Sequence, residues 1–294
     1  MKTLTIFTPT YNRAYCLHQC YDSLVSQTNQ DFIWLIVDDG STDDTKDLVS
    51  KWMNEGKIDI EYVWQENQGM HGAHNMAYEC MQTELNVCID SDDYMPVDAV
   101  EKILNFWDKY GNDQVSGLIG LDSDPDNNII GTKLPEELQS ATLFELYANH
   151  GVTGDKKLVY RTELTKQYPY PIFPGEKYVG LAYKYYQLDI DYKVLLMNEV
   201  LCCVEYLPDG SSRNMLQQYV KNPKGFSFYR IELMKLPFTK ISFKFRQAIH
   251  YVSSSLLDKN RAFLKETPQK TLTILALPLG LMLSVYIKLK TKSA

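Results

Sequence analysis

The chain of 294 residues is predicted to be an α/β protein in which helices flank a mainly parallel β-sheet. Short apolar runs alternate with helical patterns through the first 120 residues, which is typical of βαβ units. Hydrophobic residues make up 45% of the sequence and aromatic residues 12%, enough for a packed core and not a disordered chain. Polar and acidic residues follow the apolar runs, where parallel sheets bind their ligands.

The strands and helices alternate in a regular order. Four short apolar runs predict strands at residues 4–8, 32–37, 58–64 and 85–89. Helical patterns lie between them at about 15–27, 43–55 and 71–82.

The remaining sequence changes character twice. Residues 121–210 are rich in Gly, Pro and Tyr and are typical of loops laid over a sheet, with one further predicted strand at 156–161 (KKLVYR). After Pro208 the pattern becomes helical and basic.

The six cysteines predict buried thiols of a reduced cytoplasmic protein. None forms a CxxC pair, and no Cys/His set has the spacing of a zinc site. The start, MKTLTIFTPTYNR, lacks the layout of a signal peptide and is predicted to be the first strand.

Charge divides the chain unevenly. From Leu216 onward, 14 Lys and Arg face three acidic residues, a balance of +11, whereas residues 1–215 hold 16 against 34, a balance of −18. A basic region of this kind would meet nucleic acid or an anionic membrane surface. No nucleic-acid-binding motif accompanies it, so we expect no nucleic-acid partner.

The stretch DSDD places Asp90, Asp92 and Asp93 directly after an apolar strand. Carboxylates this close repel one another, and carboxylate oxygens suit Mg²⁺ or Mn²⁺, which usually bridge to phosphates. A solvated turn is the simpler alternative. The stretch DDGSTDD, after the second strand, also permits a purely structural interpretation, since Ser41 to Asp44 matches a helix capping box.

Four motifs in order resemble the signature series of glycosyltransferase family 2, which are inverting enzymes with the GT-A fold. They are TPTYNR (8–13), VDDGSTDDT (37–45), NQGMHGAHN (67–75) and DSDDYMP (90–96), and the resemblance covers about residues 1–205. It implies a catalytic domain over 1–207, with nucleotide-sugar binding in 1–120 and the acceptor side in 121–207. Residues 208–294 would form a basic helical region.

The resemblance also implies residue roles. Asp39 would contact the base, Asp90 and Ser91 would lie near the ribose or diphosphate, and Asp92 or Asp93 would hold the metal. A zinc pair at His71 and His74 is the alternative for the third motif, but HExxH is missing. Met70 stands where relatives often carry Lys, and Gly72 and Asn75 would equally suit a helix start. Further donor contacts are expected from Pro9, Tyr11, Arg13, Gly69, His71 and Asn75.

The catalytic base should be a carboxylate within reach of an acceptor hydroxyl. Many family members carry a Glu-Asp pair beyond the middle region, whereas this chain has Glu176 followed by Lys177. Glu176 is the predicted base, and Asp155 in GVTGDKK is the second candidate. An ordinary acid in the first turn of a helix is the structural alternative for Glu176.

The predicted function is a metal-dependent transfer of one sugar from a UDP-linked donor to a hydroxyl of a glycan or lipid-linked glycan, in cell-surface polysaccharide or capsule synthesis. The transferred group would be a hexosyl or N-acetylhexosaminyl unit. A nucleotidyltransferase acting on sugar phosphates is one alternative, although TPTYNR lacks a glycine-rich phosphate loop. A non-catalytic scaffold with the same fold is the other. The oligomeric state is left open.

The C-terminal region is predicted to meet the cytoplasmic face of the membrane. Apolar residues between Ile241 and Leu257 fall at helical spacing among basic residues, and a core-facing helix is the alternative. The run 271–287 would reach about 26 Å as a helix, short of the roughly 30 Å hydrocarbon core. Because Pro278 and Gly280 interrupt the run and lysines follow it, we expect a peripheral or re-entrant anchor.

Overall fold

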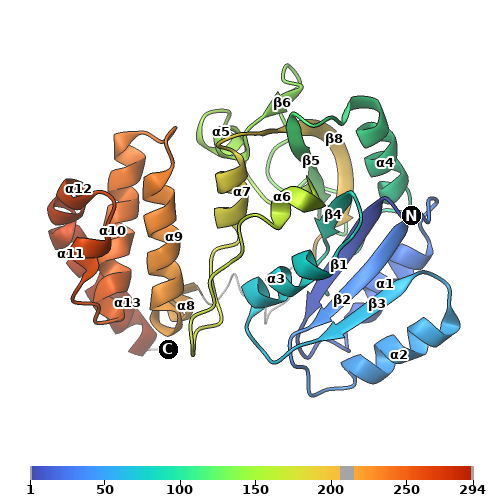
Figure 1. Ribbon diagram of the computed structural model, residues 1–294, viewed down its shortest axis with the longest axis horizontal. Coiled ribbons are helices and arrows are strands. Elements are labelled where there is room, and N and C mark those ends of the chain that lie inside the picture. The colour runs from blue at the N-terminus through green and yellow to red at the C-terminus, as the bar shows by residue number, and fades with distance from the viewer. Residues whose placement is uncertain (1, 206–214, 293–294) are drawn as a thin grey trace. The chain divides into compact units, whose positions relative to one another are not determined.

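The computed structural model describes residues 2–205 and 215–292 (Figure 1). They form two compact units, one of Met1–Pro169 with Asp191–Leu207 and one of Tyr170–Ile190 with Pro208–Ala294. The domain boundary expected between residues 207 and 208 lies in 206–214, outside the described residues. Residues 170–190, which the sequence grouped with the acceptor side of the first domain, are part of the helical unit.

The first unit is built on an eight-stranded sheet of order β3-β2-β1-β4-β7-β5-β8-β6. β1 pairs in parallel with both β2 and β4, β2 with β3, and β5 with β8, whereas β7 is antiparallel to β4 and β5. The carboxyl ends of β1, β2 and β4 therefore meet at one edge. The strands are β1 (Leu4–Thr10), β2 (Phe32–Asp38), β3 (Ile60–Trp64), β4 (Leu85–Cys88), β5 (Val115–Ser123), β6 (Ser140–Ala141), β7 (Lys156–Arg161) and β8 (Lys193–Cys203).

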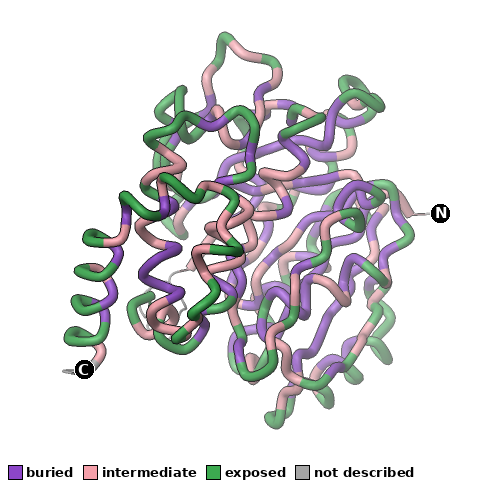
Figure 2. The backbone as a smooth tube through the Cα atoms, turned by 60° about the vertical axis from the view of Figure 1, so that its left-hand side comes forward, coloured by how far each residue is buried: buried purple, intermediate pink, exposed green. Residues whose placement is uncertain are grey.

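Helices cover both faces of this sheet, so its central strands are buried on both sides (Figure 2). Leu4 and Ile6 of β1 join a core with residues of α1, α2 and α4, while Phe7 points to the other face and meets the rings of His74 and Tyr78 on α3. Alternate side chains of a strand face opposite sides, which produces this division. The helices are α1 (Leu17–Val25), α2 (Thr45–Glu55), α3 (Met70–Cys80), α4 (Ala99–Tyr110), α5 (Leu143–Ala148) and α6 (Thr162–Thr165).

The α/β class and the predicted order of strands and helices through residue 89 are confirmed, with ends shifted by a few residues. The sequence pattern did not reveal β5 and β8. Glycines and a polar Asn-Glu pair interrupt their apolar runs, and the β5–β8 register shifts along the pair. A Cβ added at Gly120 would lie 2.3 Å from Leu201 Cδ1, so glycine is needed where these strands approach.

The second unit is helical. Its core contains Met234, Ala248, Tyr251, Val252 and Ala276. The helix predicted at 241–257 is confirmed as α10, and most of its apolar side packs inside this unit, as in the core-facing alternative. Among the described residues, no helix combines the length and apolar character needed to cross a bilayer. The helices are α7 (Ala182–Leu188), α8 (Met215–Lys221), α9 (Pro223–Lys235), α10 (Ile241–Leu257), α11 (Phe263–Glu266), α12 (Lys270–Leu275) and α13 (Leu277–Lys292).

Candidate active site

The loops that follow β1 and β2 are bonded to each other at the ligand-binding edge. Asn12 lies in the left-handed region at φ 54°, and its Oδ1 accepts the backbone N–H of Thr42 at 2.8 Å. The N–H of Asn12 donates to Ser41 Oγ at 2.9 Å, and that of Ala14 donates to Asp43 Oδ2 at 3.0 Å. The first two sequence motifs therefore form one rigid surface.

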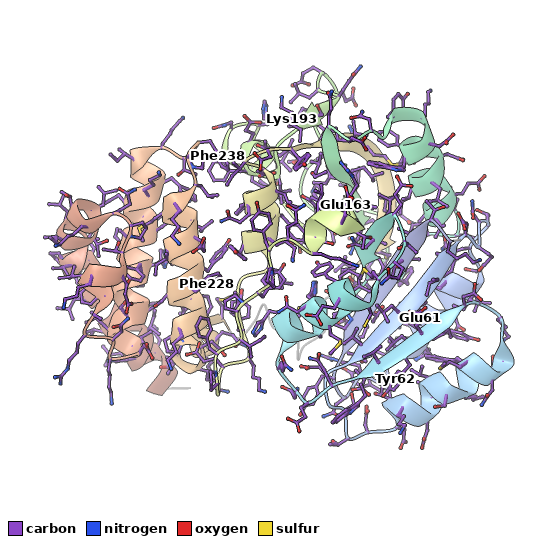
Figure 3. The ribbon with its side chains drawn as sticks, viewed as in Figure 1. Glu61, Tyr62, Glu163, Lys193, Phe228 and Phe238 are labelled. Carbon is purple, nitrogen blue, oxygen red and sulfur yellow. The ribbon has the colours of Figure 1, made fainter. Side chains whose placement is uncertain are left out.

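The two acids at the end of β2 hold neighbouring segments in place. Asp38 accepts the N–H of Ser41 at 2.7 Å and the hydroxyl of Tyr62 at 2.6 Å. Tyr62 lies on β3 and is labelled in Figure 3. The buried Asp39 carboxylate accepts the Gln65 side-chain amide at 2.6 Å. It also accepts the N–H groups of Gln68 and Gly69, each at 2.8 Å. Asp39 thus organises the loop that leads into α3.

The first motif presents its aromatic and basic side chains to solvent. Tyr11 is 50% exposed, and Arg13 is half-buried with its guanidinium 5.6 Å from the centre of the Tyr15 ring. Pro9 is buried within β1 opposite Val37. Tyr11 and Arg13 are therefore the side chains of this motif that a nucleoside can reach, while Pro9 shapes the strand beneath.

The third motif opens α3. Gly69 precedes the helix at φ 84°, a conformation that favours glycine, and Asn75 is half-buried on the helix. His71 and His74 are both buried. His74 lies edge-on to Phe7, and its Nδ1 is 3.3 Å from the Tyr78 hydroxyl. The His74 side chain therefore packs in the core between α3 and the sheet.

The acid cluster after β4 has one member turned inward and two nearer the surface. Asp93 is 4% exposed, and its Oδ1 accepts the N–H of Glu205 at 3.2 Å. Burial, together with the charges of Asp90 and Asp92, raises the pKa of Asp93 to about 8 against the opposing effect of Lys157. Asp90 and Asp92 are half-buried.

Lys157 supplies a buried positive charge beneath this cluster. Its Nζ lies 4.0 Å from Asp122 Oδ1 and donates to the Cys88 carbonyl at 3.4 Å, just before Asp90. Burial alone would lower the pKa of Lys157, but the surrounding acids, Asp122 and Asp93 among them, raise it well above its usual range. In the sequence, this residue is marked only by being a lysine inside the predicted strand KKLVYR.

The carboxylates of this cluster could supply only part of the ligands of a divalent cation. Asp90 and Asp92 offer hard oxygen ligands at the end of a strand, whereas Asp93 is engaged with the chain leaving β8. Over residues 2–205 and 215–292, no three His, Cys, Asp or Glu side chains form a group able to hold a metal. A cation bound by one or two carboxylates would take its other ligands from water and phosphate.

The two predicted bases differ in their surroundings. Glu176 is buried in the helical unit, where its Oε1 accepts the N–H of Lys224 at 3.0 Å and its Oε2 accepts that of Gly225 at 2.8 Å. Asp155 is exposed just before β7. Because β7 runs antiparallel to β4, with Val159 opposite Val87, Asp155 emerges at the same edge as the acid cluster.

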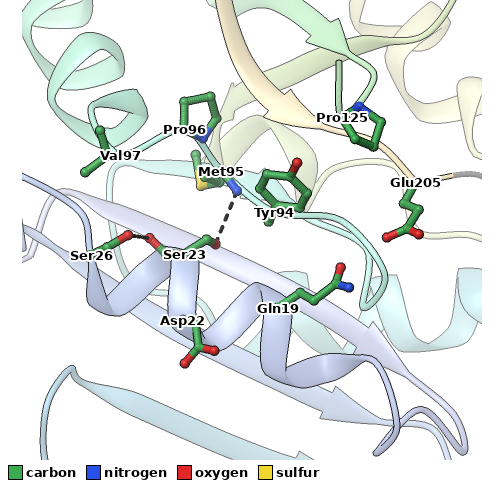
Figure 4. A pocket seen from close by; sticks show the side chains of 10 residues that line it. All are labelled: Gln19, Asp22, Ser23, Ser26, Tyr94, Met95, Pro96, Val97, Pro125 and Glu205. Atoms are coloured by element: carbon green, nitrogen blue, oxygen red, sulfur yellow. Dashed lines mark hydrogen bonds between the residues drawn. The ribbon is translucent and has the colours of Figure 1, made fainter. Parts of the chain in front are cut away.

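A pocket of about 630 Å³ opens beside the loop that follows the acid cluster (Figure 4). α1 forms one wall with Asp22 and Ser23, and Tyr94 and Glu205 form part of another. The Met95 N–H donates to Ser23 Oγ at 3.2 Å, which ties the loop to α1. The N–H of Glu205 also donates to Asp93, so the chain that leaves β8 contacts both the pocket and the acid cluster.

Comparison with known proteins adds a family match. Residues 5–168 match the family model described as glycosyl transferase family 2. A poly(ribitol-phosphate) beta-glucosyltransferase of Bacillus spizizenii is 23% identical over 277 residues, covering 88% of this chain and 43% of that protein. The chain spans less than half the length of the curated relatives it matches.

Solved structures share the fold at low identity. S. aureus TarS 1–349 in complex with UDP-GlcNAc has a TM-score of 0.63 and 18% identity, covering 94% of this chain and 79% of that one. A mannosyltransferase from Pyrobaculum calidifontis, in complex with GDP-Man and Mn²⁺, has a TM-score of 0.55 and 16% identity, covering 96% and 87%.

Proposed function

The chain belongs to glycosyltransferase family 2, and on this basis we propose that it transfers one sugar from a UDP-linked donor to a hydroxyl of a glycan or lipid-linked glycan. The observation that carries the proposal is the meeting of three motifs at the carboxyl ends of β1, β2 and β4. The similarity to a glucosyltransferase of a polyol-phosphate polymer and to a structure with UDP-GlcNAc supports a hexosyl or N-acetylhexosaminyl group and a cell-surface polymer.

In the proposed complex the loops after β1 and β2 hold the nucleoside. Tyr11 would stack on the base and Arg13 would face phosphate, because both side chains are accessible on a rigid support. Asp39 would contribute to binding of the nucleotide base through the loop whose N–H groups it accepts. Asp90 and Ser91 would approach the ribose, and Gly69, His71 and Asn75 would border the sugar.

We propose Asp92, with Asp90, as the carboxylates that hold Mn²⁺ or Mg²⁺, and Asp93 as the residue that anchors their loop to the end of β8. A bound cation would offset the charge that grows on the departing diphosphate. Lys157 and the N–H of Glu205 keep the repelling carboxylates in place from below.

For the catalytic base we propose Asp155 ahead of Glu176. A base must accept the proton of the acceptor hydroxyl while that oxygen attacks the anomeric carbon from the face opposite the diphosphate. Both oxygens of Glu176 already accept backbone N–H groups, whereas Asp155 is exposed at the edge of the acid cluster. A single displacement of this kind inverts the anomeric configuration. The pocket between α1 and Tyr94 would receive part of the acceptor.

The proposed site of action is the cytoplasmic face of the cell membrane, where nucleotide sugars are available to a peripheral enzyme. The support is the basic character of the chain from Leu216 onward, with 14 Lys and Arg against three acidic residues.

The test is donor hydrolysis by the purified full chain, with a panel of nucleotide sugars and Mn²⁺ present or removed by chelation. We expect release of UDP and free sugar from a UDP-hexose or UDP-N-acetylhexosamine, with loss of activity in Asp92→Ala. The control is Asp126→Ala, which removes an exposed acid elsewhere in the same unit. Pyrophosphate production would indicate a nucleotidyltransferase, and no turnover of any donor would indicate a non-catalytic scaffold.

A further inference from the structure

We infer that the outward face of α12 and α13 is the surface that docks on an anionic lipid bilayer. The inference rests on the proposed function for its setting at a membrane. It narrows the expected anchor at 271–287 to one face of two helices. We call this surface the outer face. It consists of Ile274, Leu275, Leu279, Leu281, Met282, Val285 and Tyr286, each between 44% and 67% exposed.

The outer face is continuous along the two helices. Leu275, Leu279, Met282 and Tyr286 follow one another at steps of four, three and four residues, so they lie on one line of the helix surface. The remaining members occupy the adjacent line. Figure 2 shows the C-terminal helix with one exposed side and one buried side.

The buried side of the same helices carries several small or short polar residues, beside Leu272 and Leu277, which pack against the core of this unit. Thr273, Ala276, Gly280 and Ser284 are buried, together with Ile287. A Cβ added at Gly280 would lie 2.5 Å from Val252 Cβ, so α13 approaches α10 closely at this point.

This distribution, with large apolar residues outward as well as inward, differs from that of a helix that faces water. A helix at a water-exposed surface turns its large apolar residues inward and its polar residues outward. Small residues at the helix contact and large apolar residues outside are typical of helices that face lipid. The outer face is therefore built for a hydrocarbon environment.

The charges around the outer face select an anionic surface. Residues 267–292 contain no Asp or Glu. Lys288 follows Leu281 by seven residues and Lys290 follows Tyr286 by four, so the two exposed lysines border the outer face on its two sides. Lysines in this position reach lipid phosphates while their methylene chains stay beside the apolar residues. Since no described helix is suited to cross a bilayer, the helices would lie in its surface.

The experiment is co-sedimentation of the full chain with vesicles of mixed phosphatidylglycerol and phosphatidylcholine. We expect binding that weakens at high salt and is poor on pure phosphatidylcholine. The double variant Leu279→Glu/Met282→Glu should bind these vesicles at least about ten-fold more weakly, because it removes two apolar contacts and adds two negative charges. The matched control is Ile241→Glu, which changes an apolar residue that is 73% exposed on α10 in the same unit. It should bind like the unchanged chain.

Two further measurements separate the possible results. Donor hydrolysis in vesicle-free buffer should be equal in all three proteins, which shows that the variants are folded. Failure of vesicle binding with hydrolysis intact overturns this inference alone, whereas vesicle binding without any hydrolysis overturns the proposed function alone. Light scattering tests whether a second copy of the chain, and not lipid, covers the outer face. A dimer that the double variant converts to a monomer, with no vesicle binding by either, would overturn the inference in favour of a protein interface.

Discussion

Replacing Glu176 should reduce stability more than it reduces catalysis. α9 begins at Pro223, and the side chain of its N-cap residue Asn222 is not available to the helix because its Oδ1 accepts the N–H of Lys177 at 2.6 Å. Glu176 takes over the capping, with one oxygen for each of the N–H groups of Lys224 and Gly225. The contact joins two segments that are about 48 residues apart in the sequence.

The size of the effect follows from those two bonds. Glu176→Ala leaves two N–H groups near the helix start without a partner, at a cost of about 2–4 kcal/mol in the free energy of unfolding. Glu176→Gln keeps one acceptor oxygen and loses the negative charge at the helix N-terminus, a loss of about 1–2 kcal/mol. Burial raises the pKa of Glu176, so the ionised group already bears a desolvation cost and the lower part of each range is expected.

The assay combines urea unfolding with turnover of the donor. Glu176→Gln should shift the unfolding midpoint to lower urea and keep near-normal turnover at temperatures where it is folded. Asp155→Asn is the matched comparison. It should change stability by no more than about 0.5 kcal/mol, because the residue is exposed, and lower turnover by about 10²-fold or more. Unchanged stability with lost turnover in Glu176→Gln, beside a normal Asp155→Asn, would refute this reasoning and make Glu176 the base.

Four other perturbations test the electrostatics of the two units. Asp92→Ala should abolish Mn²⁺-dependent UDP binding, measured by calorimetry, without lowering the melting temperature. Asp93→Asn should flatten the pH dependence of stability. The pKa of Asp93 in the folded protein, about 8, lies above the value in the unfolded chain, so the native protein loses stability as pH rises from about 4 to 8. An equal change of unfolding free energy with pH in both proteins would contradict this. His250→Gln should remove a pH dependence of the opposite sign, because burial, with Arg230 and Arg246, lowers the pKa of His250 to about 4. The native protein therefore loses about 1–2 kcal/mol as pH falls from 6.5 to 4, after allowance for partial exposure, and the variant should not. Lys157→Met should lower the free energy of unfolding, measured in urea, by about 3–5 kcal/mol, because it leaves a buried carboxylate without its positive partner. Adding Asp122→Asn should recover part of this loss, because both charges of the pair are then removed. A double variant less stable than the single variant would argue against the pairing.

The sequence alone determined the α/β class, the order of the first strands and helices, and the family. Strand β7 was predicted at its observed residues, Lys156–Arg161. These features are local, because a short apolar run and the polar residues at its end can be recognised without knowing what packs against them. The motifs at the ends of β1, β2 and β4 were found for the same reason, since parallel strands bring their carboxyl ends to one edge.

Only the tertiary structure decided how each candidate side chain is buried and hydrogen-bonded. Asp92 and Asp93 are adjacent in sequence, yet Asp93 turns inward because the chain leaving β8 donates a hydrogen bond to it. Glu176 became a helix cap because α9 begins beside it, and α10 lies in a helical core although its sequence is basic and amphipathic. Helical spacing defines a face but not what covers it. α13 approaches α10 closely at Gly280 and leaves several large apolar residues outward, an orientation that helical spacing alone did not decide.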